Sequence, residues 1–141
     1  MHLYPWFPSS LPIMVVYSLT SPRVQLDLRL NRLGPEGAAV LAPAIAVCAS
    51  LTKILVGGNQ LGDEGTTILC DALRESKVTK VQVLDLYGND IGPDGAKAIA
   101  ALCTVCASMT QADLEYNKLG DEAKAALRKA VEGRLGFELN L

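Results

Sequence analysis

The sequence predicts an α/β solenoid, in which one strand–turn–helix unit is repeated along the chain. The first observation is a phrase that recurs four times and begins with asparagine, as in Asn59-Gln-Leu-Gly-Asp-Glu-Gly65. The four asparagines are separated by 28, 30 and 28 residues; they are Asn31, Asn59, Asn89 and Asn117. In addition, apolar residues alternate with others before each phrase and recur four positions apart after it. A nearly constant period of this length indicates one structural unit copied in series.

The 141 residues fit a single domain, which we expect to have two parts. Residues 1–22 lack the repeat and hold four of the seven prolines, so an irregular N-terminal leader is predicted there. Three interpretations of the leader stay open: a cover over the first repeat, a segment not native to the repeat, or a signal peptide with its apolar core at Leu11 to Leu19. The signal peptide is disfavoured because no Lys or Arg precedes that core. Residues 23–141 are predicted to form about four repeats plus a terminal strand at 137–141.

Short strands are predicted before each asparagine, because a period of two residues places alternate side chains on opposite faces of a sheet. The buried positions would be Leu26 and Leu28, Ile54 and Val56, Leu84 and Leu86, and Ala112 and Leu114. We expect each strand to end at its asparagine. The asparagine amides are expected to satisfy backbone groups of the turns, which is a structural role.

A helix is predicted after each phrase. The glycine three residues after each asparagine is expected to have a positive φ, and the Pro or Asp and acidic residues that follow suit a helix N-terminus. Two rows of residues four apart would face the sheet: Leu41, Leu69, Ile99 and Leu127, then Ile45, Leu73, Cys103 and Val131. Pro43 lies within the first helix, so a kink or a shortened helix is expected there.

The four cysteines occupy repeat positions, which favours packed free thiols over a disulfide framework. Cys48 and Cys106 both lie 17 residues after an asparagine, in the phrase Val-Cys-Ala-Ser. Cys103 and Cys106 have the spacing of a redox motif or half of a zinc site, but no second pair of ligands follows at zinc spacing. No metal or cofactor is therefore predicted. Free thiols suit a reducing compartment, so a cytoplasmic location is expected.

These phrases resemble the leucine-rich repeat, in its long ribonuclease-inhibitor-like form. The pattern Leu-x-x-Leu-x-Leu-x-x-Asn-x-Leu, followed by Gly-x-x-Gly, is matched in order by Val81, Leu84, Leu86, Asn89, Ile91, Gly92 and Gly95. The resemblance covers about residues 23–141. It implies a horseshoe with a short parallel sheet on the concave face and helices on the convex face. Strands spaced about 4.8 Å apart and helices spaced about 10 Å apart would curve the stack in that sense.

The side chains between the buried strand positions would form columns on the concave face. The residues predicted to bind a partner are Asp27, Arg29, Lys53, Leu55, Asp85, Tyr87, Asp113, Glu115 and Tyr116. Gly57 and Gly58 would leave a notch among them, and tyrosines supply contact area with a polar tip. A catalytic or metal-binding role for Asp85 and Asp113 is disfavoured, because the only histidine is His2.

The leading functional prediction is a non-catalytic protein-interaction module, with a protein partner bound at the concave face. The resemblance implies this use, which it shares with NOD-like receptors and the ribonuclease inhibitor. An alternative is a regulator of a small GTPase, similar to the Ran GTPase-activating proteins, with Arg29 and Arg32 as the nearest exposed arginines. A third interpretation is a fragment of a longer solenoid that self-associates through uncapped ends. The net charge of −2 argues against nucleic acid, and no apolar run is long enough to span a membrane.

Overall fold

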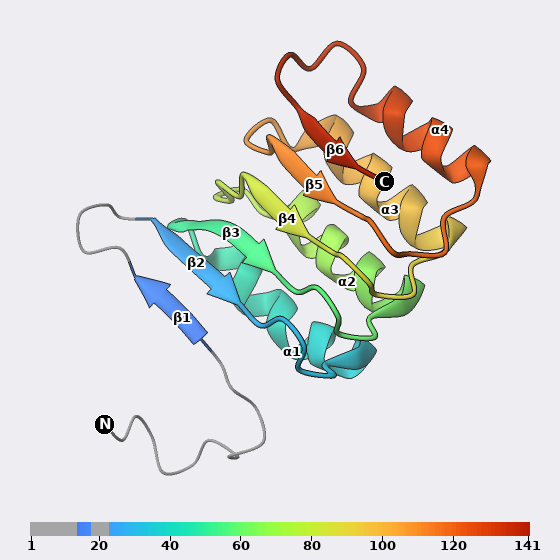
Figure 1. Cartoon of the computed structure of the whole chain (residues 1–141). Coiled ribbons are helices and arrows are strands. Elements are labelled where there is room, and N and C mark those ends of the chain that lie inside the picture. Colours follow the sequence, from blue (N-terminus) through green and yellow to red (C-terminus); the bar gives the residue numbers. More distant parts are fainter. Residues whose placement is uncertain (1–13, 18–22) are drawn as a thin grey trace.

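The computed structural model describes residues 14–17 and 23–141 (Figure 1). In these ranges six strands form one sheet in chain order: β1 (Met14–Tyr17), β2 (Val24–Asp27), β3 (Leu51–Leu55), β4 (Val83–Asp85), β5 (Gln111–Asp113) and β6 (Glu138–Asn140). The helices are α1 (Gly34–Val47), α2 (Gly62–Glu75), α3 (Pro93–Val105) and α4 (Asp121–Ala130). Strands β2 to β6 are parallel, and the four helices lie on one side of the sheet. The predicted fold class is confirmed.

Strand β1 departs from the irregular leader that the sequence predicts. It pairs antiparallel with β2, so that Met14 lies opposite Asp27 and Tyr17 opposite Val24. The backbone of β2 has no repeat before it to pair with, and β1 takes that edge. The prolines of the leader and most of the apolar stretch proposed as a signal peptide core lie outside the described residues.

The core lies between the sheet and the helices. From the strands it takes Ile54, Leu84 and Ala112, all at most 1% exposed. From the helices it takes most of the two predicted rows, namely Leu69, Ile99, Leu127, Ile45, Leu73 and Cys103, all buried. Leu41 and Val131 are only partly buried, since no described helix precedes α1 and Val131 lies just beyond α4. Helix α1 is as long as α2, 14 residues, so the shortening expected from Pro43 is wrong.

The periodic asparagines join each repeat to the one before it. Asn59 Oδ1 accepts hydrogen bonds from the backbone N–H groups of Asn31 and Leu33, at 2.9 and 3.3 Å. Its Nδ2 donates to the carbonyls of Leu28 and Val56, at 2.9 and 2.8 Å. Asn89 repeats this arrangement one unit further on. The amide thus satisfies turn backbone that the buried position keeps from water.

The strands end four residues earlier than predicted, at Asp27, Leu55, Asp85 and Asp113. The chain then turns through the residue before each asparagine, which has a positive φ in all four repeats; these residues are Leu30, Gly58, Gly88 and Tyr116. The later glycines also differ from expectation. Gly34 and Gly62 have positive φ, but Gly92 and Gly120 do not. Gly34 and Gly62 donate their N–H to the asparagine carbonyl of the next repeat, whereas Gly92 donates back to Asp63.

A candidate binding pocket on the strand face

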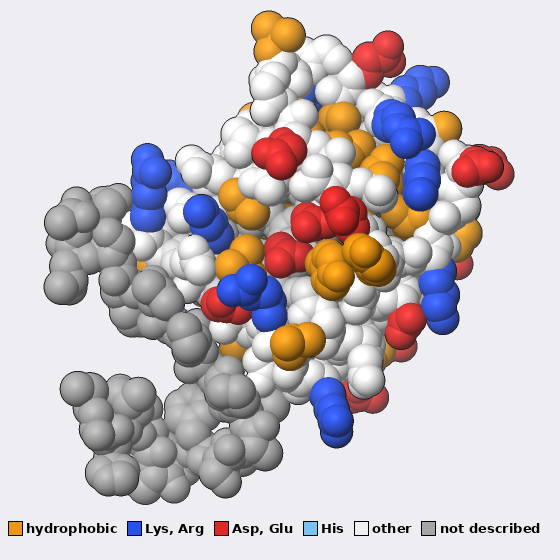
Figure 2. All heavy atoms as spheres, viewed as in Figure 1, with side chains coloured by type: hydrophobic (Ala, Val, Ile, Leu, Met, Phe, Trp, Pro, Cys, Tyr) orange, Lys and Arg blue, Asp and Glu red, His pale blue; other side chains and the backbone are white. Residues whose placement is uncertain are grey.

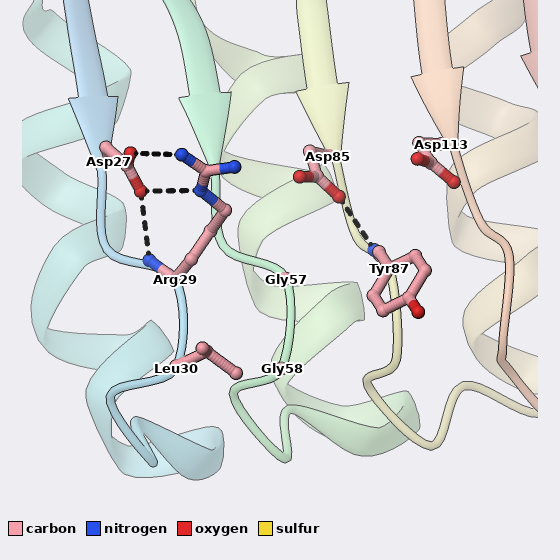
Figure 3. Close-up of a pocket in the computed structure, with 8 residues that line it drawn as sticks. All are labelled: Asp27, Arg29, Leu30, Gly57, Gly58, Asp85, Tyr87 and Asp113. Atoms are coloured by element: carbon pink, nitrogen blue, oxygen red, sulfur yellow. Dashed lines mark hydrogen bonds and ion pairs between the residues drawn. The ribbon is translucent and has the colours of Figure 1, made fainter.

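A pocket of about 590 Å³ opens on the strand face, which we define as the side of the sheet turned away from the helices. It lies beyond the ends of β2 to β5, and Figure 3 shows its lining: Asp27, Arg29, Leu30, Gly57, Gly58, Asp85, Tyr87 and Asp113. Figure 2 shows acidic side chains gathered in the middle of this face, with hydrophobic side chains beside them. Five of the nine predicted partner-binding residues meet here, around the glycine notch.

Gly57 and Gly58 line the hollow, because neither carries a side chain and both lie close to neighbouring atoms. A Cβ on Gly57 would lie 3.3 Å from both Asp85 Oδ1 and the Tyr87 carbonyl oxygen. A Cβ on Gly58 would lie 2.5 Å from Leu30 Cδ2, and the φ of Gly58 is +68°. The side chain of Leu30 therefore covers Gly58 and forms one wall, while Tyr87 forms the other.

Three aspartates at the ends of β2, β4 and β5 share one local geometry. The Oδ1 atom of each accepts the backbone N–H of the residue two positions on: Arg29 for Asp27, Tyr87 for Asp85 and Glu115 for Asp113. The strands are in register, so the carboxylates form one column, with Leu55 between the first and second. The repeat therefore aims three carboxylates in a common direction.

In the described part of the chain, a cation is paired with the first of these carboxylates and not with the other two. The Arg29 side chain donates two hydrogen bonds to Asp27, from Nε to Oδ1 at 2.9 Å and from Nη2 to Oδ2 at 2.7 Å. These bonds lower the pKa of Asp27. Within the described residues no ion pair reaches Asp85 or Asp113.

The environment of Asp85 differs from that of Asp27. Partial burial raises the pKa of Asp85, and the charges of Asp113 and Asp27 raise it further, against the opposing effects of the Tyr87 N–H and Arg29. The carboxylate of Asp85 is thus held in a negative, partly desolvated setting without a cation paired to it. A cationic group of a binding partner would offset the repulsion between Asp85 and the neighbouring carboxylates.

Two tyrosines stand beside the carboxylates. The rings of Tyr87 and Tyr116 are 5.0 Å apart between centroids and inclined at 46°. Tyr87 is 42% exposed and Tyr116 77% exposed. Tyr116 and Leu30 both have positive φ, a backbone conformation that costs a side-chain-bearing residue about 1–2 kcal/mol. The equivalent residues of the other two repeats are glycines, Gly58 and Gly88, which adopt a positive φ without that cost.

Four predicted site residues do not line this pocket. Lys53 is exposed in a different row of β3, and Leu55 lies in the carboxylate column outside the pocket. Tyr116 reaches the site through its contact with Tyr87. Glu115 instead lines a second hollow of about 540 Å³ beside β6. Leu30 was missed by the sequence analysis, although an apolar residue at a position that is glycine in two other repeats was a usable signal.

The described residues contain no group of three or more His, Cys, Asp or Glu side chains arranged to hold a metal ion. Cys48, Cys70, Cys103 and Cys106 are free thiols, and the last three are buried. Burial raises the pKa of Cys103 to about 11. No described helix has both the length and the apolar character to span a membrane.

Comparison with known proteins agrees with this architecture. The family model described as "Leucine Rich repeat" matches residues 24–42, 47–67 and 79–100. Among curated proteins, mouse NACHT, LRR and PYD domains-containing protein 12 is 32% identical over 75% of this chain and 10% of its own length. Pig ribonuclease inhibitor is 32% identical over 80% of this chain and 25% of its own length. RAN GTPase-activating protein 2 of Arabidopsis thaliana is 32% identical over 77% of this chain and 20% of its own length.

The chain therefore spans between 10% and 25% of the length of these relatives. Among solved structures, the tropomodulin C-terminal domain of Caenorhabditis elegans superimposes with a TM-score of 0.68, covering 83% of this chain and 72% of that one. At 15% identity that likeness bears on the fold alone. The three matched segments fall on successive strand–turn–helix units. Hydrogen bonds from the backbone N–H of each periodic asparagine to the side chain of the next connect all four repeats. The chain belongs to the leucine-rich repeat family and is of the ribonuclease-inhibitor-like type.

Proposed function

We propose that this chain is a protein-interaction module that binds its partner through the strand face, at the pocket over Gly57 and Gly58. The observation that carries the proposal is that pocket, a hollow of about 590 Å³ walled by exposed Leu30 and Tyr87. Aromatic side chains that are exposed in the free protein are common anchors of protein interfaces. The neighbouring residues of the predicted surface, Lys53, Leu55, Glu115 and Tyr116, would form its rim.

A binding role has more support than a catalytic one. The pocket is an open hollow lined by carboxylates, one paired arginine and apolar walls, and the partner-binding proposal uses all of these groups. The ribonuclease inhibitor, which shares 32% identity with this chain, is by its name a protein that inhibits an enzyme, and such a role supports an interaction module. We propose no cofactor. The free thiols are consistent with a reducing compartment, and we propose the cytoplasm.

A role as a regulator of a small GTPase is the alternative that the likeness to a RAN GTPase-activating protein favours. Stimulation of hydrolysis uses groups that stabilise developing phosphoryl charge. Arg29 is held by two bonds to Asp27, which leaves Arg32, exposed in the first turn, as the candidate. A GTP-hydrolysis assay with Ran tests this: acceleration that Arg32→Ala removes supports it, and no acceleration by the wild type removes it.

Self-association through the sheet edge is a second proposed contact. Among the described strands β6 pairs only with β5, and its Leu139 and the flanking Phe137 and Leu141 are partly exposed. An unpaired edge with apolar neighbours favours pairing with another chain. Light scattering over a range of protein concentrations tests this, and a monomer throughout that range contradicts it.

The main proposal is tested by affinity capture with purified wild type and two double variants. Tyr87→Ala with Asp85→Ala alters the pocket. Val105→Ala with Glu122→Ala, which changes exposed residues of the helix layer, is the control. We expect a defined set of proteins that the wild type and the control retain and the pocket variant loses. Partners unchanged by the pocket variant, with its fold verified by circular dichroism, would count against the strand face.

A further inference from the structure

We infer that the group bound in the pocket is an arginine side chain of the partner, with its guanidinium placed against Asp85 and Asp113 and its stem between Leu30 and Tyr87. This inference rests on the proposed function and adds the chemistry of the partner to it. The evidence is that the equivalent carboxylate of the first repeat, Asp27, already binds a guanidinium.

Asp27 is an internal example of the proposed contact. Asp27, Asp85 and Asp113 occupy equivalent strand ends, lie in register, and accept the same backbone bond from the residue two positions on. In the first repeat that residue is Arg29, whose guanidinium binds both oxygens of Asp27. In the third and fourth repeats it is Tyr87 or Glu115, neither of which can supply a cation. The third and fourth repeats thus place a carboxylate in the same geometry as Asp27, but without an arginine to bind it.

The charge of the pocket favours a cation. Its lining carries three carboxylates and one guanidinium, and the guanidinium is committed to Asp27. Asp85 and Asp113 occupy paired positions on neighbouring strands, so one guanidinium can reach both carboxylates. One oxygen of each accepts a backbone N–H, which fixes the carboxylate orientation and leaves the second oxygen without a hydrogen bond from any described residue. Two pre-oriented acceptors suit a donor with several N–H groups in one plane.

The apolar walls favour arginine over lysine. A planar guanidinium can bind carboxylates in a fork and stack on an aromatic ring, whereas an ammonium is a compact and strongly hydrated point charge. The Tyr87 and Tyr116 rings, 5.0 Å apart, stand next to the carboxylate column. Leu30, 81% exposed on the opposite wall, offers a surface for the aliphatic stem.

The test is a nuclear magnetic resonance titration of the isotope-labelled full chain with three blocked tripeptides, Gly-Arg-Gly, Gly-citrulline-Gly and Gly-Lys-Gly. Citrulline has the shape of arginine without its charge. The reporters are the backbone amides of Tyr87 and Glu115, which donate to the two carboxylates, and of Gly57. We expect the arginine peptide to shift these amides and to bind about tenfold more tightly than the citrulline peptide, and more tightly than the lysine peptide.

The pocket variant for this titration is Asp85→Asn with Asp113→Asn, which keeps the backbone acceptors. Its control is Glu122→Gln with Glu132→Gln, the same charge change at exposed sites near the C-terminal end. The pocket variant should lose about tenfold in arginine-peptide affinity and the control should not. Equal shifts by the citrulline or lysine peptide, or an unchanged pocket variant, would overturn the inference. So would calcium chloride alone, if it moved the same amides to the same extent.

The two proposals fail in different ways. If the arginine peptide does not bind, but captured partners still depend on the strand face, the arginine inference is wrong and the proposed function stands. If the arginine peptide binds as expected, but no captured protein depends on Tyr87 and Asp85, the proposed function is wrong and the pocket chemistry stands.

Discussion

Asp63, in the first turn of α2, accepts the backbone N–H of Gly92 at 2.7 Å and so caps the helix of the following repeat. The same oxygen also accepts the N–H of Gly95, at 2.9 Å, within α3. The first turn of a helix leaves N–H groups without partners inside the helix, and α3 has no capping side chain of its own. Repeats two and three are therefore joined at their helix starts as well as through their asparagines.

Replacing this cap should weaken the whole domain. We expect Asp63→Ala to lower the free energy of unfolding by about 1–2 kcal/mol, because two N–H groups lose their acceptor and a negative charge leaves a helix N-terminus. The control is Asp121→Ala, at the same repeat position in α4, where the aspartate is exposed and no following helix is described. Urea unfolding followed by circular dichroism provides the comparison. Equal losses in the two variants would show that the cap across repeats contributes nothing.

Asp85 and Asp27 should affect stability with opposite signs. The folded pKa of Asp85 is raised above the ordinary 3.8, so its charge destabilises the fold. That penalty is absent below the ordinary value and is complete once the pH has passed the folded pKa. The folded pKa of Asp27 is lowered, so its charge stabilises the fold above the ordinary value, and that contribution is lost as the pH falls through the folded pKa.

Single variants separate these effects. Near neutral pH, Asp85→Asn should raise the urea midpoint and Asp27→Asn should lower it, and both differences should shrink as the pH falls toward and below the ordinary aspartate value. The asparagine at position 85 keeps an acceptor for the Tyr87 N–H, which isolates the charge. A lower midpoint for Asp85→Asn at neutral pH would mean that the carboxylate contributes to stability. The conflict between charge and fold proposed for this pocket would then be wrong.

The thiols should react in the order of their burial. Cys70 and Cys103 are almost fully buried, and desolvation raises the pKa of both thiols, that of Cys103 to about 11. Cys48 is partly exposed. Because the thiolate is the reactive form, we expect iodoacetamide to label Cys48 first, and Cys70 and Cys103 only when the domain unfolds. Mass spectrometry of digests from native and urea-treated protein measures the order. Rapid labelling of Cys103 in native protein would revive a redox role.

The repeat allowed much of this structure to be predicted, because position in a repeat specifies burial. The leucines before each asparagine, the helix rows and the strand register all follow from one period, and the carboxylate column follows from the register. The strand ends could not be predicted from the period, because the alternation of apolar residues continues at Leu28 and Leu86, beyond the last paired residues of their strands. Strand β1 was also missed, since it lies outside the repeat and no period predicts its pairing with β2. The pocket depends on side-chain packing, as where Leu30 crosses Gly58.

Leu30 provides the sharpest test of whether strain in this chain serves binding. Its φ of 60° is unfavourable for leucine, and it is 81% exposed, so burial returns little. Leu30→Gly should relieve about 1–2 kcal/mol of left-handed strain, offset by about 0.5–1 kcal/mol of added chain entropy in the unfolded state. We therefore expect equal or slightly higher stability in urea, together with weaker binding of the arginine tripeptide and of captured partners.

The reverse change at Gly88 isolates the strain. Gly88 occupies the same repeat position with a φ of 59°, and no heavy atom lies within 4 Å of where its Cβ would be. Gly88→Leu should therefore cost about 1–2 kcal/mol by backbone conformation alone. If Leu30→Gly instead destabilised the domain by more than about 2 kcal/mol, its loss would be that of a packing residue. Leu30 would then be retained for its contact with Gly58, and its exposure would not indicate a binding role.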